Sequence, residues 1–172
     1  MSAFDICYPS VIRSEGGYVN NPRDNGGETN LGVTRRAWEA WTGKPASATD
    51  MRALTVAAVR PFYRAMYWNA IHGDSFAPAL ALCLFHCAVN AGPKRAAKMI
   101  QKVVGALPDG SIGPATIAAV NLWVATHGVR SAVSAYQNAL RDFYHALPTF
   151  PTFGNGWLNR AKDVERQALE MA

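Results

Sequence analysis

The apolar stretch from Leu80 to Val89 constrains the fold more than any other feature of the sequence. Its ten residues are too few to cross a membrane, which takes about 20 apolar residues in a helix. Pro, Gly, Asn or Arg interrupts every other apolar run in the chain. A short segment that is apolar all round is typical of a helix buried on every side. We therefore predict one central helix with further helices packed around it.

The composition indicates a folded globular protein. The chain has 172 residues, of which 49% are apolar and 17% charged, and this balance excludes a disordered chain. The length suits one domain, or a domain with a small appendage. Residues 1–15 lack a basic start and a clean apolar core, so we expect no signal peptide.

The first helix is predicted to end in a carboxylate. Phe4, Tyr8 and Val11 recur at helical spacing, and Glu15 stands at the C-terminal end of that apolar stripe. Gly16-Gly17 follows and should terminate the helix. A carboxylate in this place is not expected as surface decoration, which makes Glu15 a candidate functional residue.

The remaining sequence predicts a mainly α fold with one small β element. Residues 18–32 are rich in Asn, Pro, Asp, Gly and Thr, which favours tight turns and short strands, so we expect a β-hairpin flap near residues 18–33. Helical spacing dominates the rest of the chain. The predicted helices include those capped by Thr34, Thr49 and Thr55, then Pro93 to Val103, Ala115 to Val124, Val129 to Leu147, and a final helix from Trp157 after a Pro/Phe/Gly loop.

The cysteines indicate neither a disulfide nor a metal site. Cys83 and Cys87 are four residues apart in a predicted helix, where they share a face but lie too far apart to be bridged. No second Cys or His pair follows at zinc spacing. We expect buried free thiols, no metal and no cofactor.

The charge favours an anionic partner. The formal net charge is +5, and residues 87–172 hold nine Lys and Arg against five acids. A basic surface of this kind suits nucleic acid, an anionic membrane or the acidic polymers of a cell wall. Charge alone does not separate these three.

The sharpest chemical feature is a set of three residues around the predicted flap. Asp24 lies nine residues after Glu15, and Thr29 five residues later, with Gly-Gly pairs on both sides. Glycosidic cleavage needs one protonated acid for the leaving oxygen and one carboxylate that activates water or attacks directly. The same residues also suit an ordinary helix end and an ordinary Asp-Asn-Gly turn. From chemistry alone both interpretations stay open.

Two longer motifs point to a known family. The segment EGGYVNNPRDNGGETNLGVT, residues 15–34, resembles the signature of glycoside hydrolase family 108, the muramidases of phage endolysins and related bacterial lysozyme-like proteins. VNAGP at residues 89–93 and DGSIGPAT at residues 109–116 resemble the peptidoglycan-binding region that usually accompanies it. Together the resemblances span roughly residues 4–169.

The resemblance implies a lysozyme-like helical fold that cleaves the β-1,4 bond between N-acetylmuramic acid and N-acetylglucosamine. Glu15 matches the catalytic acid, Asp24 the second carboxylate, and Thr29 the hydroxyl that helps to hold the attacking water. Family members often carry an acid where this chain has His86, a departure that leaves the catalytic set intact. A lone His in an apolar helix is more often a core residue.

Four further residues are candidates for substrate binding. They are Tyr18, Trp68, Asn69 and Asn90. An aromatic ring suits the apolar face of a sugar and an amide suits its hydrogen-bonding edge. Aromatic side chains at helical spacing are, however, usually core residues, and Asn90 is equally suited to cap a helix.

These observations lead to a specific expectation for the whole chain. Residues 1–91 form the catalytic lysozyme-like region, and residues 92–172 a helical peptidoglycan-binding region. We expect a monomer that cleaves the glycan strands of peptidoglycan. It is expected to accumulate in the host cytoplasm and to reach the periplasm and wall through a holin or a secretion system. A non-catalytic wall-binding protein on the same scaffold is the alternative. A nucleic-acid partner is not expected, because the basic residues are not interleaved with aromatic ones in a recognisable module.

Overall fold

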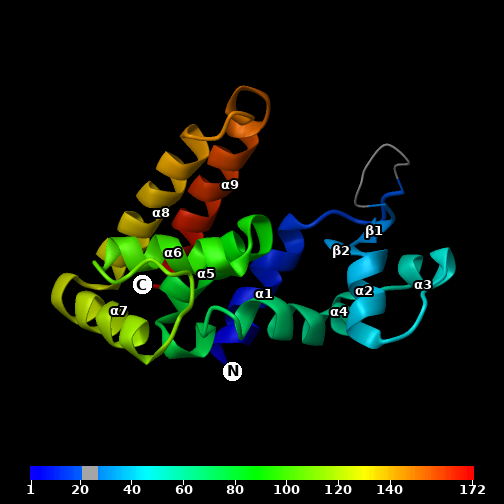
Figure 1. Cartoon of the computed structure of the whole chain (residues 1–172), viewed down its shortest axis with the longest axis horizontal. Coiled ribbons are helices and arrows are strands. Elements are labelled where there is room, and N and C mark those ends of the chain that lie inside the picture. Colours follow the sequence, from blue (N-terminus) through cyan, green and yellow to red (C-terminus); the bar gives the residue numbers. More distant parts are fainter. Residues whose placement is uncertain (21–26) are drawn as a thin grey trace. The chain divides into compact units, whose positions relative to one another are not determined.

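The computed structural model describes residues 1–20 and 27–172 and is mainly helical, with one small antiparallel hairpin, as predicted (Figure 1). The elements, in chain order, are α1 (Ala3–Ser14), β1 (Thr29–Asn30), β2 (Val33–Thr34), α2 (Arg35–Thr42), α3 (Ala48–Arg52), α4 (Val56–Tyr63), the π-helix η1 (Arg64–Trp68), the 3-10 helix η2 (Gly73–Ser75), α5 (Pro78–Ala91), α6 (Pro93–Val103), α7 (Pro114–His127), α8 (Val129–His145) and α9 (Phe150–Glu170). None of the described helices is both long enough and apolar enough to span a membrane.

The chain divides into two compact units. The smaller unit contains residues 8–66, and the larger unit contains residues 1–7 and 67–172. The functional regions expected from the sequence, 1–91 and 92–172, stay a prediction.

The hairpin of the smaller unit is tight and anchored at both ends. Thr29 pairs with Thr34 and Asn30 with Val33, and the turn between them is made by Leu31 and Gly32 at φ 49° and 72°. Positive φ at both turn residues suits the right-handed twist of the strands. The buried Asn30 side chain donates to the Met51 carbonyl of α3 at 2.8 Å, so the hairpin is fixed against a helix.

Side-chain caps explain where the short helices begin. Thr34 accepts from the backbone N–H of Ala37, and Thr55 caps α4 in the same way, as predicted. The predicted cap at Thr49 is wrong, because Ser47 caps α3 in a reciprocal capping box with Asp50. α3 therefore begins at Ala48, and Thr49 lies inside the helix.

The larger unit is built around α5, which confirms the predicted central helix. Every residue from 79 to 88 is buried, and α6, α8 and α9 pack against it. Figure 1 shows α8 and α9 running side by side as an antiparallel pair within this unit. Cys7, Cys83 and Cys87 are buried free thiols, as expected.

A buried glutamine explains the DGSIGPAT motif. The Gln101 side chain is 1% exposed, and its amide nitrogen donates to Asp109 Oδ1, the Ser111 carbonyl and Thr116 Oγ1 at 2.7–3.1 Å. Its oxygen accepts from the Gly110 N–H at 2.9 Å. The amide therefore fixes the turn at residues 109–111 and the start of α7 in one network.

The last helix begins seven residues earlier than predicted, at Phe150 instead of Trp157. Pro151 lies in the first turn, where its missing N–H costs nothing. The Phe150 ring covers Gly154, at which a Cβ would come within 2.5 Å of the ring. Glycine is thus required there by packing, and the predicted Pro/Phe/Gly loop is wrong.

Candidate active site

Glu15 immediately follows α1 and is partly buried. The α1 residues Tyr8, Val11 and Ile12 are buried, and the backbone N–H of Glu15 donates to the Ile12 carbonyl at 3.2 Å. Gly16 comes next, with open space where a Cβ would lie. The described geometry therefore places a carboxyl group at the end of an apolar helix, beside an open segment of chain.

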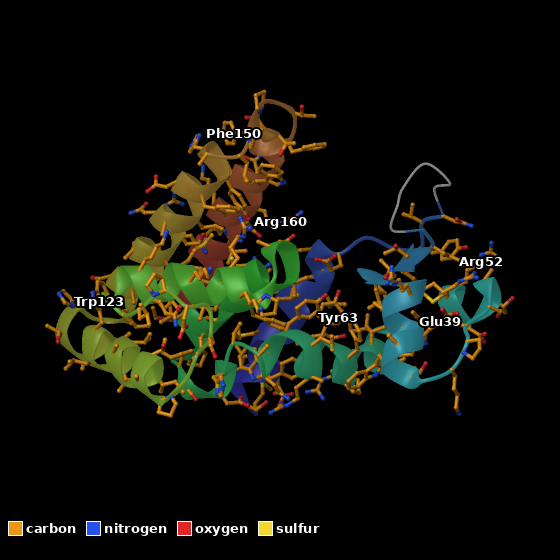
Figure 2. All side chains as sticks on the ribbon, in the orientation of Figure 1. Glu39, Arg52, Tyr63, Trp123, Phe150 and Arg160 are labelled. Carbon is orange, nitrogen blue, oxygen red and sulfur yellow. The ribbon has the colours of Figure 1, made fainter. Side chains whose placement is uncertain are left out.

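The hairpin turn packs directly on the Glu15 carboxyl. A Cβ built on Gly32 would lie 2.5 Å from Glu15 Oε2, and closer still to the hydroxyl of Tyr63. Tyr63 is fully buried and donates to the Leu31 carbonyl at 2.8 Å; Figure 2 labels its side chain. Gly32 is therefore required for the carboxyl group, the phenol and the turn to meet.

The sequence did not single out Tyr63. Its spacing of three and four residues from Met66 and Tyr67 is ordinary core periodicity, and no motif links position 63 to position 15. Gly32 belonged to the motif, but its role became visible only when its neighbours were known. Tyr8 packs edge-on against Tyr63 at 5.8 Å between ring centroids, which holds the phenol in place.

A buried ion pair supports the hairpin from its other end. Glu28 is 7% exposed, forms an ion pair with Arg35 and accepts a hydrogen bond from the Tyr18 hydroxyl. The Arg52 guanidinium lies over the Tyr18 ring, 4.9 Å from its centroid. Tyr18, a candidate for substrate binding, therefore already has its hydroxyl and one ring face engaged within the protein, and Glu28 serves to hold the hairpin.

Thr29 lies on β1, the strand that leads into the turn at Gly32. Its backbone pairs with Val19 through two hydrogen bonds of 2.8 and 2.9 Å, and its hydroxyl donates to the Gly27 carbonyl at 3.3 Å. Asp24 lies outside the described residues. Glu15 and Thr29 thus belong to one unit, with the carboxyl of the first against the hairpin that carries the second.

The other candidates for substrate binding belong to the larger unit. Trp68 is fully buried between Phe4 and Phe85, at ring-centroid distances of 5.4 and 5.3 Å. Since both neighbours cover its rings, the prediction that Trp68 offers a platform for a sugar is wrong. Asn69 and Asn90 are exposed, and the Asn90 amide donates to the His86 carbonyl within α5 at 2.8 Å.

His86 behaves as a core residue. It is 4% exposed, and burial, aided by the charge of Arg160, lowers the pKa of its imidazole to about 4. The ring is therefore neutral near pH 7. Within residues 1–20 and 27–172, no group of three or more His, Cys, Asp or Glu side chains is arranged to hold a metal ion.

Comparison with known proteins agrees with this geometry. Residues 8–92 match the family model described as Glycosyl hydrolase 108, and residues 95–162 match the model described as Predicted Peptidoglycan domain. A solved structure, "Structure of Brucella abortus SagA", is 38% identical, covers 98% of this chain and 94% of that one, and superposes with a TM-score of 0.83. The chain belongs to the glycosyl hydrolase 108 family. A search of curated proteins gave no match.

Membership of the glycosyl hydrolase 108 family assigns the chain a role on the bacterial cell wall. Its first match contains Glu15 and the whole hairpin, and its second match begins at Arg95, just after the start of α6. A glycosyl hydrolase region joined to a peptidoglycan-binding region identifies peptidoglycan as the partner of this chain.

Proposed function

We propose that the chain is an N-acetylmuramidase, which hydrolyses the β-1,4 bond between N-acetylmuramic acid and N-acetylglucosamine in peptidoglycan. The observation that carries the proposal is the Glu15 carboxyl at the end of α1, packed against Gly32 of the hairpin and close to the Tyr63 hydroxyl. Packing against a turn and a buried phenol restricts the carboxyl to a small range of positions, which general acid catalysis requires.

In this mechanism Glu15 donates its proton to the glycosidic oxygen as the bond to the anomeric carbon breaks. Asp24 removes a proton from the incoming water, whose oxygen forms the new bond from the opposite side of the sugar. Thr29 holds that water through its hydroxyl. The products are two shorter glycan chains, and Glu15 regains its proton from solvent.

The role of Thr29 favours inversion of configuration at the anomeric carbon. In the inverting scheme this hydroxyl can hold the water that attacks in the first step, whereas a nucleophilic Asp24 would form a covalent intermediate with retention before any water enters. In an inverting enzyme the two carboxyl groups are about 6.5–9.5 Å apart, and in a retaining enzyme about 5–5.5 Å.

The biological setting of the proposal is cell lysis of the endolysin type. The chain would act as a monomer, held in the host cytoplasm until a holin or a secretion system gives it access to the wall. The positive charge of +5 supports a partner with anionic groups. The competing proposal, a non-catalytic wall-binding protein, retains the peptidoglycan-binding region but leaves the packing around Glu15 without a purpose.

Product analysis tests the reaction. Purified Gram-negative sacculi are digested with the wild-type chain, and the new reducing ends are identified by reduction with borohydride and mass spectrometry, with the first-formed anomer followed by NMR. A muramidase yields reduced N-acetylmuramic acid, and inversion yields the α-anomer first. Reduced N-acetylglucosamine would assign the other glycosidic bond, and intact glycan strands would support the non-catalytic alternative. A covalent glycosyl–Asp24 adduct would overturn inversion.

A further inference from the structure

Two adjoining hollows lie in the larger unit where α6 packs beside α8. Their volumes are about 960 and 210 Å³, and Arg95 and Phe143 line both. Because they share these residues, the two hollows adjoin and are together called the α6–α8 groove. Its smaller part is also lined by Tyr144, Trp157 and Arg160, the last labelled on α9 in Figure 2. The groove belongs to one unit and is separate from the hairpin and Glu15 in the sequence.

α6 buries one face against the core. Its opposite face is basic and lines the groove. The basic face consists of Lys94, Arg95, Lys98 and Lys102. All four side chains are exposed, and in the part of the chain that the structure describes no carboxylate oxygen lies within 4.0 Å of their nitrogens. Four cations on three turns of helix face two carboxylates in the groove, and this surplus of positive charge attracts an anion.

Two of these cations are held in position. The Arg95 guanidinium lies over the Phe143 ring, 4.4 Å from its centroid, an arrangement that orients the planar group. Lys98 rests on the turn at Gly110, where a Cβ would come within 3.1 Å of Lys98 Cε. Gly110 is itself at φ 84°. Because their side chains are already ordered, these cations lose less entropy when they bind a ligand.

The groove also contains two carboxylates, with different surroundings. Asp109 accepts hydrogen bonds from the Ser111 N–H and from Gln101, at 2.8 and 2.7 Å, and these bonds, together with the charge of Lys98, lower the pKa of its carboxyl. The Asp109 carboxylate therefore serves to stabilise the turn at residues 109–111. Asp142 forms no ion pair with a described residue, so its charge faces the groove. The groove therefore offers cations together with one available anion.

We propose that the α6–α8 groove binds the stem peptides of peptidoglycan, with Arg95 and Lys98 holding their carboxylates. This inference rests on the proposed function, because it assumes that peptidoglycan is the substrate. In intact peptidoglycan the lactyl carboxyl of N-acetylmuramic acid is bound in the amide to the peptide, so the sugars are uncharged and the carboxylates of the polymer lie on the short peptides. A planar guanidinium binds a carboxylate through two parallel hydrogen bonds.

The mixed charge of the groove favours a peptide over a polyanion. A stem peptide carries amino groups as well as carboxylates, and Asp142 suits an ammonium group. Nucleic acids and phosphate-rich polymers would bring only negative charge near Asp142, which repels it. The half-buried ring of Trp157, which packs on the buried Tyr144, suits the apolar parts of a peptide next to Arg95.

Binding to a glycan with peptides and to a glycan without them tests this proposal. An E15Q chain, which should not digest its ligand, is sedimented with purified sacculi and with chitin, a β-1,4 glycan of uncharged N-acetylglucosamine that carries no peptides. The test variant adds R95Q/K98Q. The matched control adds K44Q/K162Q, which removes the same charge from two other exposed positions. Circular dichroism verifies that all variants fold, and wild-type digestion of sacculi is measured in parallel.

We expect R95Q/K98Q to weaken binding to intact sacculi at least tenfold, and K44Q/K162Q to change it less than twofold. On chitin all three E15Q chains should bind alike. Equal binding of R95Q/K98Q and its parent to intact sacculi would overturn the proposal, as would an equal loss in the control. Stronger competition by double-stranded DNA than by a soluble disaccharide-peptide, at one ionic strength, would also overturn it. Any of these results with active wild-type digestion would leave the muramidase proposal standing.

Discussion

The substitution G32A tests the geometry around Glu15, because one added methyl group must displace the carboxyl group that we propose as the acid. The new Cβ would lie 2.5 Å from Glu15 Oε2, so the carboxyl must retreat by about 0.9 Å to reach an ordinary contact of 3.4 Å. A displacement of about 1 Å can lower a catalytic rate about 100-fold. We therefore expect G32A to release reducing ends from sacculi about 100-fold more slowly than the wild type.

The same substitution has a calculable effect on stability. Gly32 is at φ 72°, where a residue with a Cβ loses about 1–2 kcal/mol. The displaced Tyr63 hydroxyl also loses its hydrogen bond to the Leu31 carbonyl, which adds about 1 kcal/mol. Urea denaturation followed by circular dichroism should show a total loss of about 2–3 kcal/mol in the free energy of unfolding.

Gly43 provides the matched control. Its φ is 69°, and a Cβ there meets nothing within 4 Å. The G43A variant should therefore lose only the backbone contribution of about 1–2 kcal/mol and retain its activity. If G32A and G43A lost the same stability and kept the same activity, the packing of the hairpin turn on Glu15 would have no functional meaning.

Two further predictions concern the larger unit. His86 has a pKa of about 6.5 in the unfolded chain and about 4 in the folded chain. As the pH falls from 6.5 to 4, the unfolded chain therefore binds a proton that the folded chain does not, and the free energy of unfolding decreases by about 3 kcal/mol. Thermal denaturation at pH 7 and pH 4.5 should show a smaller acid-induced drop for H86L than for the wild type, and parallel drops would refute the assignment. The variant Q101L should lose about 2–4 kcal/mol, since the buried amide makes four hydrogen bonds. Q137L, at an equally buried amide without such a network, should lose far less, and an equal loss in both would show that the network does not matter.

Local signals in the sequence predicted the helices well. Side-chain caps at Thr34 and Thr55 and the Gly-Gly pair after Glu15 act through the nearest backbone groups, so their effect does not depend on the rest of the fold. The central helix was predictable because its own residues are apolar on every side, and such a helix must be buried. These features need no knowledge of distant contacts.

Distant contacts explain what the sequence did not reveal. The position of Trp68 in the sequence suits either a core residue or a sugar platform. Its contacts with Phe4 and Phe85 show that it is a core residue. Tyr63 reaches the region of Glu15 because the hairpin turn at Gly32 lies between them, although the two residues are far apart in the chain. The sequence did not predict the start of α9, because proline and glycine usually end helices. Here Pro151 lies in the first turn, and Gly154 is covered by the Phe150 ring.

The central claim is that the Glu15 carboxyl is the acid of a glycosidase, and the rate at which purified sacculi release reducing ends tests it most directly. The variants E15Q and E170Q each remove one carboxylate, and Glu170 is an exposed residue paired with Arg166 at the end of α9. With folding verified by circular dichroism, E15Q should lower the rate about 10²–10⁴-fold, while E170Q should match the wild type. An E15Q chain that keeps more than about half of the wild-type rate would contradict the claim.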